Sequence, residues 1–263
     1  MAQNKPSTTR TKKSTSNPTW RKRLIEILPF SQSQEDFFRY YQKGYNLVLS
    51  GAAGCGKTFI ALHQALNECK DHQYRKKVII VRSVVPTRDM GFLPGTQKEK
   101  EAAYTTPYEN IVNELYGDGK AWETLVDRGV IQFMTTSYIR GITLNNSIVI
   151  IDEMQNCNFH ELDSIITRVG EESRIIFTGD YYQSDFTRDR DRRGINKFLT
   201  ILEKMNYFTH IRFEWEDICR SGIVRDYIMT KELEEKESTN SANYPEAREM
   251  LYTSEEWRPG DTK

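Results

Sequence analysis

Five short apolar runs along the middle of the chain constrain its fold more than any other feature. They are Asn46–Ser50, Val78–Arg82, Val130–Met134, Ile148–Asp152 and Arg174–Thr178, with a weaker run at Phe208–Phe213. Nearly continuous apolar runs of this length are typical of strands buried on both faces, as in a parallel sheet. The connections are long enough for crossover helices, and suitable apolar spacing occurs over residues 59–69, 108–116, 159–169 and 195–205. The pattern predicts an α/β fold with a mostly parallel sheet flanked by helices.

The two ends of the chain differ in composition from this central part. Residues 1–19 are rich in Ser, Thr and Lys and contain almost no large apolar side chain, so they cannot offset the entropy lost on ordering. We expect a disordered basic arm over 1–19, a single folded domain over 20–230 and an acidic, flexible tail over 231–263. Two short helices are expected before the first strand, at Trp20–Leu28, where Pro29 would end the helix, and at Gln34–Tyr41.

Charge and cysteine content narrow the class of protein. The net charge is zero, so it gives no indication of nucleic-acid binding, and the basic arm either contacts phosphates or is simply solvated. The four cysteines have neither a C-x-x-C nor another zinc-like spacing, which fits a reducing compartment. No apolar stretch approaches the roughly 18 residues of a membrane-spanning helix, and the N-terminus lacks the apolar segment of a signal peptide. We expect a soluble, cytoplasmic protein with no membrane partner.

A glycine-rich motif follows the first apolar run. Residues 51–58 match G-x-x-x-x-G-K-[ST], between a predicted strand and a predicted helix, which disfavours a chance glycine-rich turn. In this setting backbone N–H groups and the helix N-terminus bind phosphate oxygens. Lys57 should reach the β- and γ-phosphates and the Thr58 hydroxyl should bind Mg²⁺. The predicted nucleotide-binding residues are Gly51, Ala52, Ala53, Gly54, Cys55, Gly56, Lys57, Thr58 and Phe59.

Two later apolar runs also end in polar clusters. Asp152 ends one of them, where it can hold Mg²⁺, and Glu153 follows at the position of a group that polarises the attacking water. This favours hydrolysis over a kinase, which must exclude water. The next run ends in T-G-D-x-x-Q, and Gln183 could contact the γ-phosphate or the lytic water. Because no N-K-x-D motif is present, GTP specificity is disfavoured.

Taken together, these clusters resemble superfamily 1 helicases, and the fuller pattern is similar to the PhoH family. Further family-like segments are Arg82 followed by the G-F-L-P-G loop at 91–95, R-G-I-T at 140–143, D-E-M-Q-N at 152–156, T-R-V-G at 167–170 and D-I-C-R-S at 217–221. Met154 replaces the usual Ala, and the segment before the G-F-L-P-G loop lacks the family's acidic residues. The resemblance implies a P-loop NTPase of the RecA/helicase-like type, with ATP and Mg²⁺ as cofactors and Gln34 reading adenine.

Phosphoryl transfer also needs positive charge near the γ-phosphate, often from an arginine finger. The recognisable motifs finish near Arg220, so we expect the finger to come from a neighbouring subunit, and the resemblance implies a homo-oligomeric, hexameric ring. Arg168 and Arg220 are the two candidates, and a surface ion pair is the alternative for either.

Two functions remain open at this stage. One is an ATP-driven enzyme, a possible RNA helicase, that acts on single-stranded RNA or DNA. Its candidate contacts are Arg82, Phe92, Arg140 and Thr143, although Phe92 could equally pack within the protein. The other is a nucleotide-switched oligomeric scaffold that does not translocate.

Overall fold

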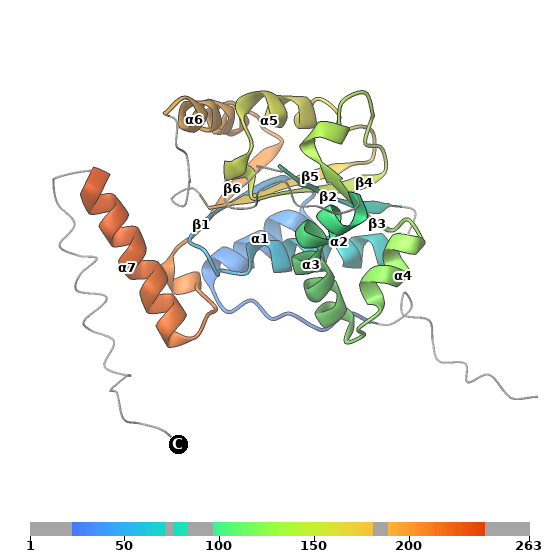
Figure 1. Ribbon diagram of the computed structural model, residues 1–263, viewed down its shortest axis with the longest axis horizontal. Coiled ribbons are helices and arrows are strands. Elements are labelled where there is room, and N and C mark those ends of the chain that lie inside the picture. The colour runs from blue at the N-terminus through green and yellow to red at the C-terminus, as the bar shows by residue number, and fades with distance from the viewer. Residues whose placement is uncertain (1–22, 72–75, 84–96, 181–188, 240–263) are drawn as a thin grey trace, which may run out of the picture.

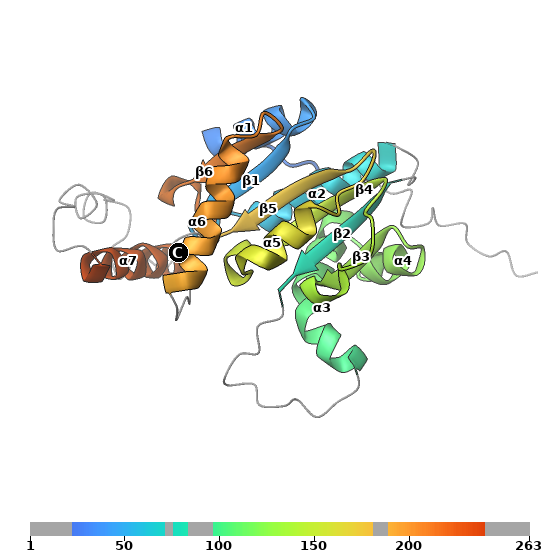
Figure 2. The ribbon, with the colours of Figure 1, turned by 90° about the horizontal axis from the view of Figure 1, so that it is seen from above.

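One parallel sheet organises the domain. The computed structural model describes residues 23–71, 76–83, 97–180 and 189–239. Within these ranges six strands pair in the order β3-β2-β4-β5-β1-β6, and every pairing is parallel (Figure 2). The strands are β1 (Asn46–Gly51), β2 (Lys77–Arg82), β3 (Ile131–Thr135), β4 (Ser147–Asp152), β5 (Arg174–Gly179) and β6 (Phe208–Phe213). The predicted α/β class and all six predicted strands are confirmed, with bounds that shift by a residue.

Helices cover both faces of this sheet (Figure 1). One face carries α1 (Gln32–Gln42), α2 (Lys57–Asp71), α3 (Gln97–Tyr116) and α4 (Ala121–Asp127). The other carries α5 (Phe159–Ile166) and α6 (Asp189–Glu203). The last helix, α7 (Gly222–Thr239), lies to one side of these layers. No helix in the described ranges combines the length and the apolarity that crossing a membrane requires.

The burial of each strand follows from its place in the sheet. All six residues of the central strand β4 are buried, as a strand covered on both faces requires. The edge strand β6 has a mixed pattern instead, with only Ile211 and Phe213 buried. Side chains alternate between two apolar cores: Leu47 and Leu49 of β1 pack toward α1 and α2, whereas Val48 packs on the α5 and α6 side.

Strand register brings the polar strand ends to one edge of the sheet. Arg82 at the end of β2 is the pairing partner of Asp152 at the end of β4. Next along the sheet, Ser50 of β1 pairs with Gly179 of β5, and Gly51 pairs with Phe213 of β6. Because all the strands are parallel, the chain leaves each of them at this same edge. Ligands of open α/β sheets bind at that edge.

The segment before α1 differs from the prediction. A helix was expected to reach Leu28, but residues 23–30 form no helix, and Trp20 lies outside the described residues. The segment is fastened across two helices instead: the Ile25 N–H donates to the carbonyl oxygen of Leu115 at 2.9 Å, and His63 Nε2 donates to the Ile25 carbonyl oxygen at 2.9 Å. These bonds occupy backbone groups that a helix would use internally, and Leu24 is buried beside them. Tertiary contacts therefore override the local helical pattern.

Other element bounds also differ from expectation. Helix α3 is much longer than the predicted helix at 108–116. It includes Pro107, and proline usually interrupts a helix, so the sequence did not predict a continuous helix here. Helix α4 was not predicted. Helix α7 reaches Thr239, and the domain boundary expected at 230 stays a prediction. The basic arm at 1–19 lies outside the described residues.

Candidate functional site

The glycine-rich loop joins β1 to α2 at the edge where the strands end. The Lys57 ammonium lies across this loop: its Nζ atom donates to the carbonyl oxygens of Gly51 at 2.9 Å and Ala52 at 2.6 Å. Lys57 is buried, since only 9% of it is exposed, so its charge is held against the backbone of the loop and not in solvent. Phe59 of α2 packs against the apolar core behind the loop. A phosphate group is the natural ligand of such an arrangement.

Only glycine fits at position 51. Its φ is +125°, and an added Cβ would lie 1.8 Å from the carbonyl oxygen of Phe213. That oxygen also accepts a hydrogen bond from the Ala52 N–H at 3.3 Å. The end of β6 therefore braces the start of the loop, and only glycine allows so close a backbone approach.

Asp152 lies where side chains from several elements of the site meet. It is buried, and its carboxylate accepts hydrogen bonds from three hydroxyl groups. Thr58 donates to Oδ1 at 2.7 Å, Thr178 donates to Oδ1 at 2.6 Å, and Tyr108 donates to Oδ2 at 2.7 Å. Thr58 lies in the first turn of α2 and Thr178 lies near the end of β5, so the motifs predicted from three separate strands do meet here.

Tyr108 was not among the residues predicted from the sequence. It lies on α3, its side chain is buried, and its ring packs against Phe133 with 5.9 Å between the ring centroids. The Arg82 guanidinium hydrogen-bonds to the same hydroxyl. Burial opposes this charge, yet the pKa of Arg82 is raised because Tyr108, Asp152 and Glu153 face it. Arg82, predicted as a nucleic-acid contact, thus lies beside the carboxylates of the nucleotide site.

Glu153 has an unusual backbone conformation. Its φ and ψ are +52° and +47°, in the left-handed region that few residues other than glycine adopt. Burial first, and then the charge of Asp152, raise the pKa of its carboxyl group, with Arg82 and the hydrogen bond from Gln155 opposing them. A strained turn that carries a carboxylate with a raised pKa is typical of a functional position.

Gln155 holds this carboxylate in place and was also missed as a site residue. Its Nε2 donates to Glu153 Oε2, and its Oε1 accepts from the Asp180 N–H at 3.1 Å. An added Cβ on Gly179 would lie 2.7 Å from that Oε1 atom, so glycine is needed to leave room for the amide. Gln155 therefore links Glu153 to the end of β5.

Gln34 lies on α1, close to the segment that braces the loop. It is buried, and its Oε1 accepts from the Phe30 N–H at 3.4 Å. The neighbouring Ser33 donates its hydroxyl to the carbonyl oxygen of Arg212 at 2.9 Å and to Asp217 Oδ2 at 3.0 Å. The start of α1 is thus tied to the end of β6 and to the residues that follow it.

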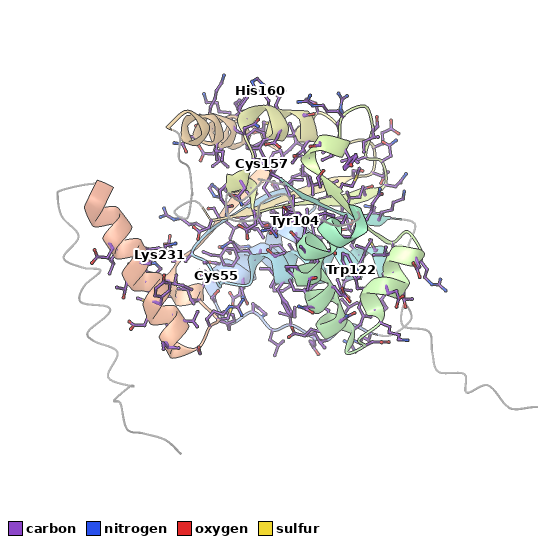
Figure 3. The ribbon with its side chains drawn as sticks, viewed as in Figure 1. Cys55, Tyr104, Trp122, Cys157, His160 and Lys231 are labelled. Carbon is purple, nitrogen blue, oxygen red and sulfur yellow. The ribbon has the colours of Figure 1, made fainter. Side chains whose placement is uncertain are left out.

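Arg220 lies against the glycine-rich loop of its own chain. An added Cβ on Gly54 would lie 2.8 Å from Cγ of Arg220, and the Cys219 N–H donates to the Gly54 carbonyl oxygen at 3.1 Å. Helix α7 contacts the same place through Ile228, and Figure 3 shows Cys55 next to this helix, which also carries Lys231. Burial raises the pKa of the Cys55 thiol to about 12. Cys55 therefore packs as an un-ionised thiol behind the loop.

Arg168 lies at the opposite edge of the sheet from Lys57. Its carbonyl oxygen accepts from the Leu144 N–H at 2.8 Å, just before β4 begins. The Nε atom of Arg168 is buried and has no hydrogen-bond partner within the part of the chain that the structure describes. Thr143 lies next to it, since an added Cβ on Gly170 would lie 2.8 Å from Thr143 Cγ2. Arg168 is therefore remote from the nucleotide site of its own chain.

The three predicted nucleic-acid contacts that lie within the described residues do not form one cluster. Arg82 faces the nucleotide site, Thr143 lies at the far edge beside Gly170, and Arg140 is exposed. Phe92 and Gln183 lie outside the described residues. The nucleotide-binding residues and the two carboxylates, by contrast, come together at one edge of the sheet.

The donors at this edge fit Mg²⁺. The Thr58 hydroxyl and the Asp152 carboxylate are hard oxygen donors within 2.7 Å of each other. The described residues contain no group of three or more His, Cys, Asp or Glu side chains that could hold a metal alone. Mg²⁺ seldom needs such a group, because it usually binds one or two carboxylates together with the phosphates of a nucleotide.

Comparisons with known proteins identify relatives of this chain. The family described as PhoH-like protein matches residues 26–231. Protein PhoH of Escherichia coli (strain K12) is 31% identical over 199 residues, which cover 75% of this chain and 56% of that protein. The PhoH-like protein of Bacillus subtilis (strain 168) is 31% identical over 178 residues, 68% of this chain and 55% of the relative. The chain thus spans about half the length of these curated relatives. Among solved structures, the large terminase from a thermophilic bacteriophage matches 78% of this chain and 50% of its own, at 13% identity and a TM-score of 0.48.

Proposed function

This chain belongs to the PhoH family, and on that premise we propose that it binds ATP and hydrolyses it with Mg²⁺ at the site described above. The hydrogen bond of 2.7 Å between Thr58 and Asp152 is the observation that carries the proposal. It joins the glycine-rich loop to the acidic strand end, the two parts that a P-loop hydrolase needs side by side. Lys57 lies on the same loop and supplies positive charge for the phosphates.

In the proposed reaction, backbone N–H groups of residues 51–58 hold the phosphates and Lys57 neutralises the β- and γ-oxygens. Thr58 and Asp152 would hold the Mg²⁺, which would supply charge neutralisation at the transferred phosphoryl group. The Lys57 ammonium leaves the carbonyl oxygens of Gly51 and Ala52 to make these contacts. Gln34 reads adenine, and its place on α1, tied to the residues after β6, supports that role.

Glu153 acts on the attacking water. Its raised pKa makes it a better proton acceptor than an ordinary carboxylate, and Gln155 fixes its direction. Gln183 completes the γ-phosphate contacts in this proposal. Arg220 lies beside Gly54 of the same chain and is suited to sense the nucleotide there, whereas Arg168 is suited to act as the finger for a neighbouring copy.

Lys57→Ala tests the ATPase directly. The variant loses the charge that faces the phosphates, so both ATP affinity and turnover should fall, while the exposed Lys120→Ala should behave like the parent. Phosphate release in the presence of Mg²⁺ measures turnover. A parent protein that ignores ATP, or a Lys57→Ala variant that splits it as fast as the parent, contradicts the proposal.

The substrate of the motor is proposed to be single-stranded RNA or DNA, with action as a helicase or remodeller. Support comes from Arg140 and Tyr138, which are exposed where the chain leaves β3 at the edge that carries the nucleotide site. Aromatic and arginine side chains are suited to unpaired bases and phosphates. Single-stranded RNA should stimulate ATP hydrolysis, and Arg140→Ala should weaken that stimulation more than the exposed Arg128→Ala does. Equal ATPase rates with and without either nucleic acid would favour the nucleotide-switched scaffold.

The assembly is proposed to be a hexameric ring in the cytoplasm, where ATP is available. Arg168 lies away from the site of its own chain, which supports a finger supplied between copies. The first two turns of α7 expose Ile223 at 81% and Tyr227 at 68%, next to the loop that Ile228 contacts. Mass measurement in solution tests the ring, and a monomer with full ATPase activity would exclude it.

A further inference from the structure

Tyr108 is a buried polar group that the proposed reaction does not yet use. Its side chain is 1% exposed, and its hydroxyl lies between two charged groups, the Asp152 carboxylate and the Arg82 guanidinium. Arg82 donates to the hydroxyl oxygen, and the hydroxyl donates to Asp152 Oδ2 at 2.7 Å. The uncharged Tyr108 hydroxyl thus connects the Asp152 carboxylate to the guanidinium group of Arg82 on the neighbouring strand.

The two oxygens of Asp152 have different partners. Thr58 and Thr178 both donate to Oδ1, whereas Tyr108 donates to Oδ2. Rotation of the carboxylate would break the Tyr108 bond and leave a hydroxyl unpaired in the apolar core, which is costly. The Phe133 ring packs against Tyr108 and keeps the phenol ring in place. The orientation of the carboxylate is therefore fixed from α3.

We infer that Tyr108 is a positioning residue for Mg²⁺: by holding Oδ2, it keeps Oδ1 of Asp152 directed at Thr58, the residue that would hold the metal together with Asp152. The inference rests on the proposed function, since it assigns a role toward the metal of the proposed ATPase. Partners that orient metal-binding carboxylates typically change metal affinity or activity by about 10-fold to 100-fold when removed.

Tyr108→Phe removes this hydroxyl and retains the ring. Tyr41→Phe is a matched control, because Tyr41 is also buried and its hydroxyl also donates to a carboxylate, Glu68 Oε2, at 2.7 Å. Binding of N-methylanthraniloyl-ADP, followed by fluorescence, is titrated with Mg²⁺ for the parent and both variants. The Mg²⁺ concentration for half-saturation should rise by about 10-fold or more in Tyr108→Phe and remain at the parent value in Tyr41→Phe. Without Mg²⁺, nucleotide affinity should be equal in all three proteins.

The urea midpoint of unfolding, measured first for each variant, distinguishes a misfolded protein from one whose Mg²⁺ requirement has changed. Tyr108→Phe loses the hydrogen bonds to Asp152 and from Arg82, whereas Tyr41→Phe loses the bond to Glu68, so the midpoint should fall at least as far in Tyr108→Phe as in Tyr41→Phe. An unchanged Mg²⁺ requirement in folded Tyr108→Phe, or an equal rise in both variants, overturns the inference and leaves the proposed ATPase intact. A parent protein that neither binds the labelled ADP nor hydrolyses ATP overturns the proposed function and this inference with it.

Discussion

Replacing Thr178 by Val removes one of the three hydroxyl groups that donate to the Asp152 carboxylate, with little change in side-chain shape. Thr178 is 1% exposed, and its Oγ1 lies 2.6 Å from Asp152 Oδ1, so a buried bond to a carboxylate is lost. Hydrogen bonds to charged groups contribute about 1.5–3 kcal/mol to folding. In a domain of this size the corresponding fall in Tm is about 3–12 °C. Thr178→Val should therefore be destabilised clearly, although it buries the same apolar volume.

Thr178→Ser separates the hydroxyl from the methyl group. It keeps the bond to Asp152 and loses one methyl, at a cost of about 1 kcal/mol. The free energy of unfolding should fall in the order parent, Thr178→Ser, Thr178→Val. Thr200→Val is a control, since the Thr200 hydroxyl bonds to the Asn196 carbonyl oxygen on an exposed helix surface. Its stability should stay within about 0.5 kcal/mol of the parent.

Urea unfolding followed by circular dichroism measures these differences. The urea midpoint should change while the m-value stays constant, since the same surface is exposed on unfolding. If Thr178→Val is as stable as the parent, the hydroxyl contributes nothing. The description of Asp152 as a carboxylate held by three hydroxyls would then be wrong.

Two further predictions concern other parts of the chain. Burial would raise the pKa of Glu68, but hydrogen bonds from Tyr41 and Lys76 and the charge of Arg174 outweigh it and lower the pKa below 4.5. The ionised carboxylate therefore stabilises the fold above that pH, and this contribution is lost as the pH falls through the folded-state pKa. Urea midpoints measured from about pH 7 to about pH 3 should therefore fall less steeply for Glu68→Gln than for the parent, and parallel slopes would contradict this. Gly179→Ala places a Cβ 2.7 Å from Gln155 Oε1, so it should lower kcat for ATP much more than nucleotide affinity. In Gly119→Ala the added Cβ meets nothing within 4 Å, and kcat should not change; equal kinetics for the two alanine variants would refute the role of Gln155.

The sheet and the meeting of the motifs could be predicted from the sequence because both follow from local rules. Runs such as Ile148–Asp152 are apolar throughout only when both faces are covered, and parallel pairing then sends every strand end to one edge. Lys57, Thr58 and Asp152 meet for that reason. The spacing of the motifs along the chain was enough to find them.

The residues that orient the carboxylates could not be found in this way. Tyr108 lies on a helix, far along the chain from Asp152, and no local pattern distinguishes it from a core tyrosine. Gln155 follows Glu153 closely, yet its role depends on the tight turn at Glu153 and on the space that Gly179 leaves. Both roles arise from tertiary geometry.

The segment before α1 and the position of Arg220 show the same limit. Leu24 and Ile25 have a helical pattern, but long-range hydrogen bonds to Leu115 and His63 decide their conformation. Arg220 was considered as a finger for a neighbouring copy, and the structure places its side chain against Gly54 of its own chain. Sequence alone did not indicate that the chain after β6 turns back over the loop.

The central claim is that Glu153 directs water at a triphosphate held by the glycine-rich loop. Glu153→Gln keeps the shape of the side chain and an oxygen for Gln155, but it cannot accept a proton from water. ATP affinity should be retained, whereas the steady-state rate of phosphate release should fall by about 10²- to 10⁴-fold. A Glu153→Gln protein that hydrolyses ATP at the parent rate would contradict the account.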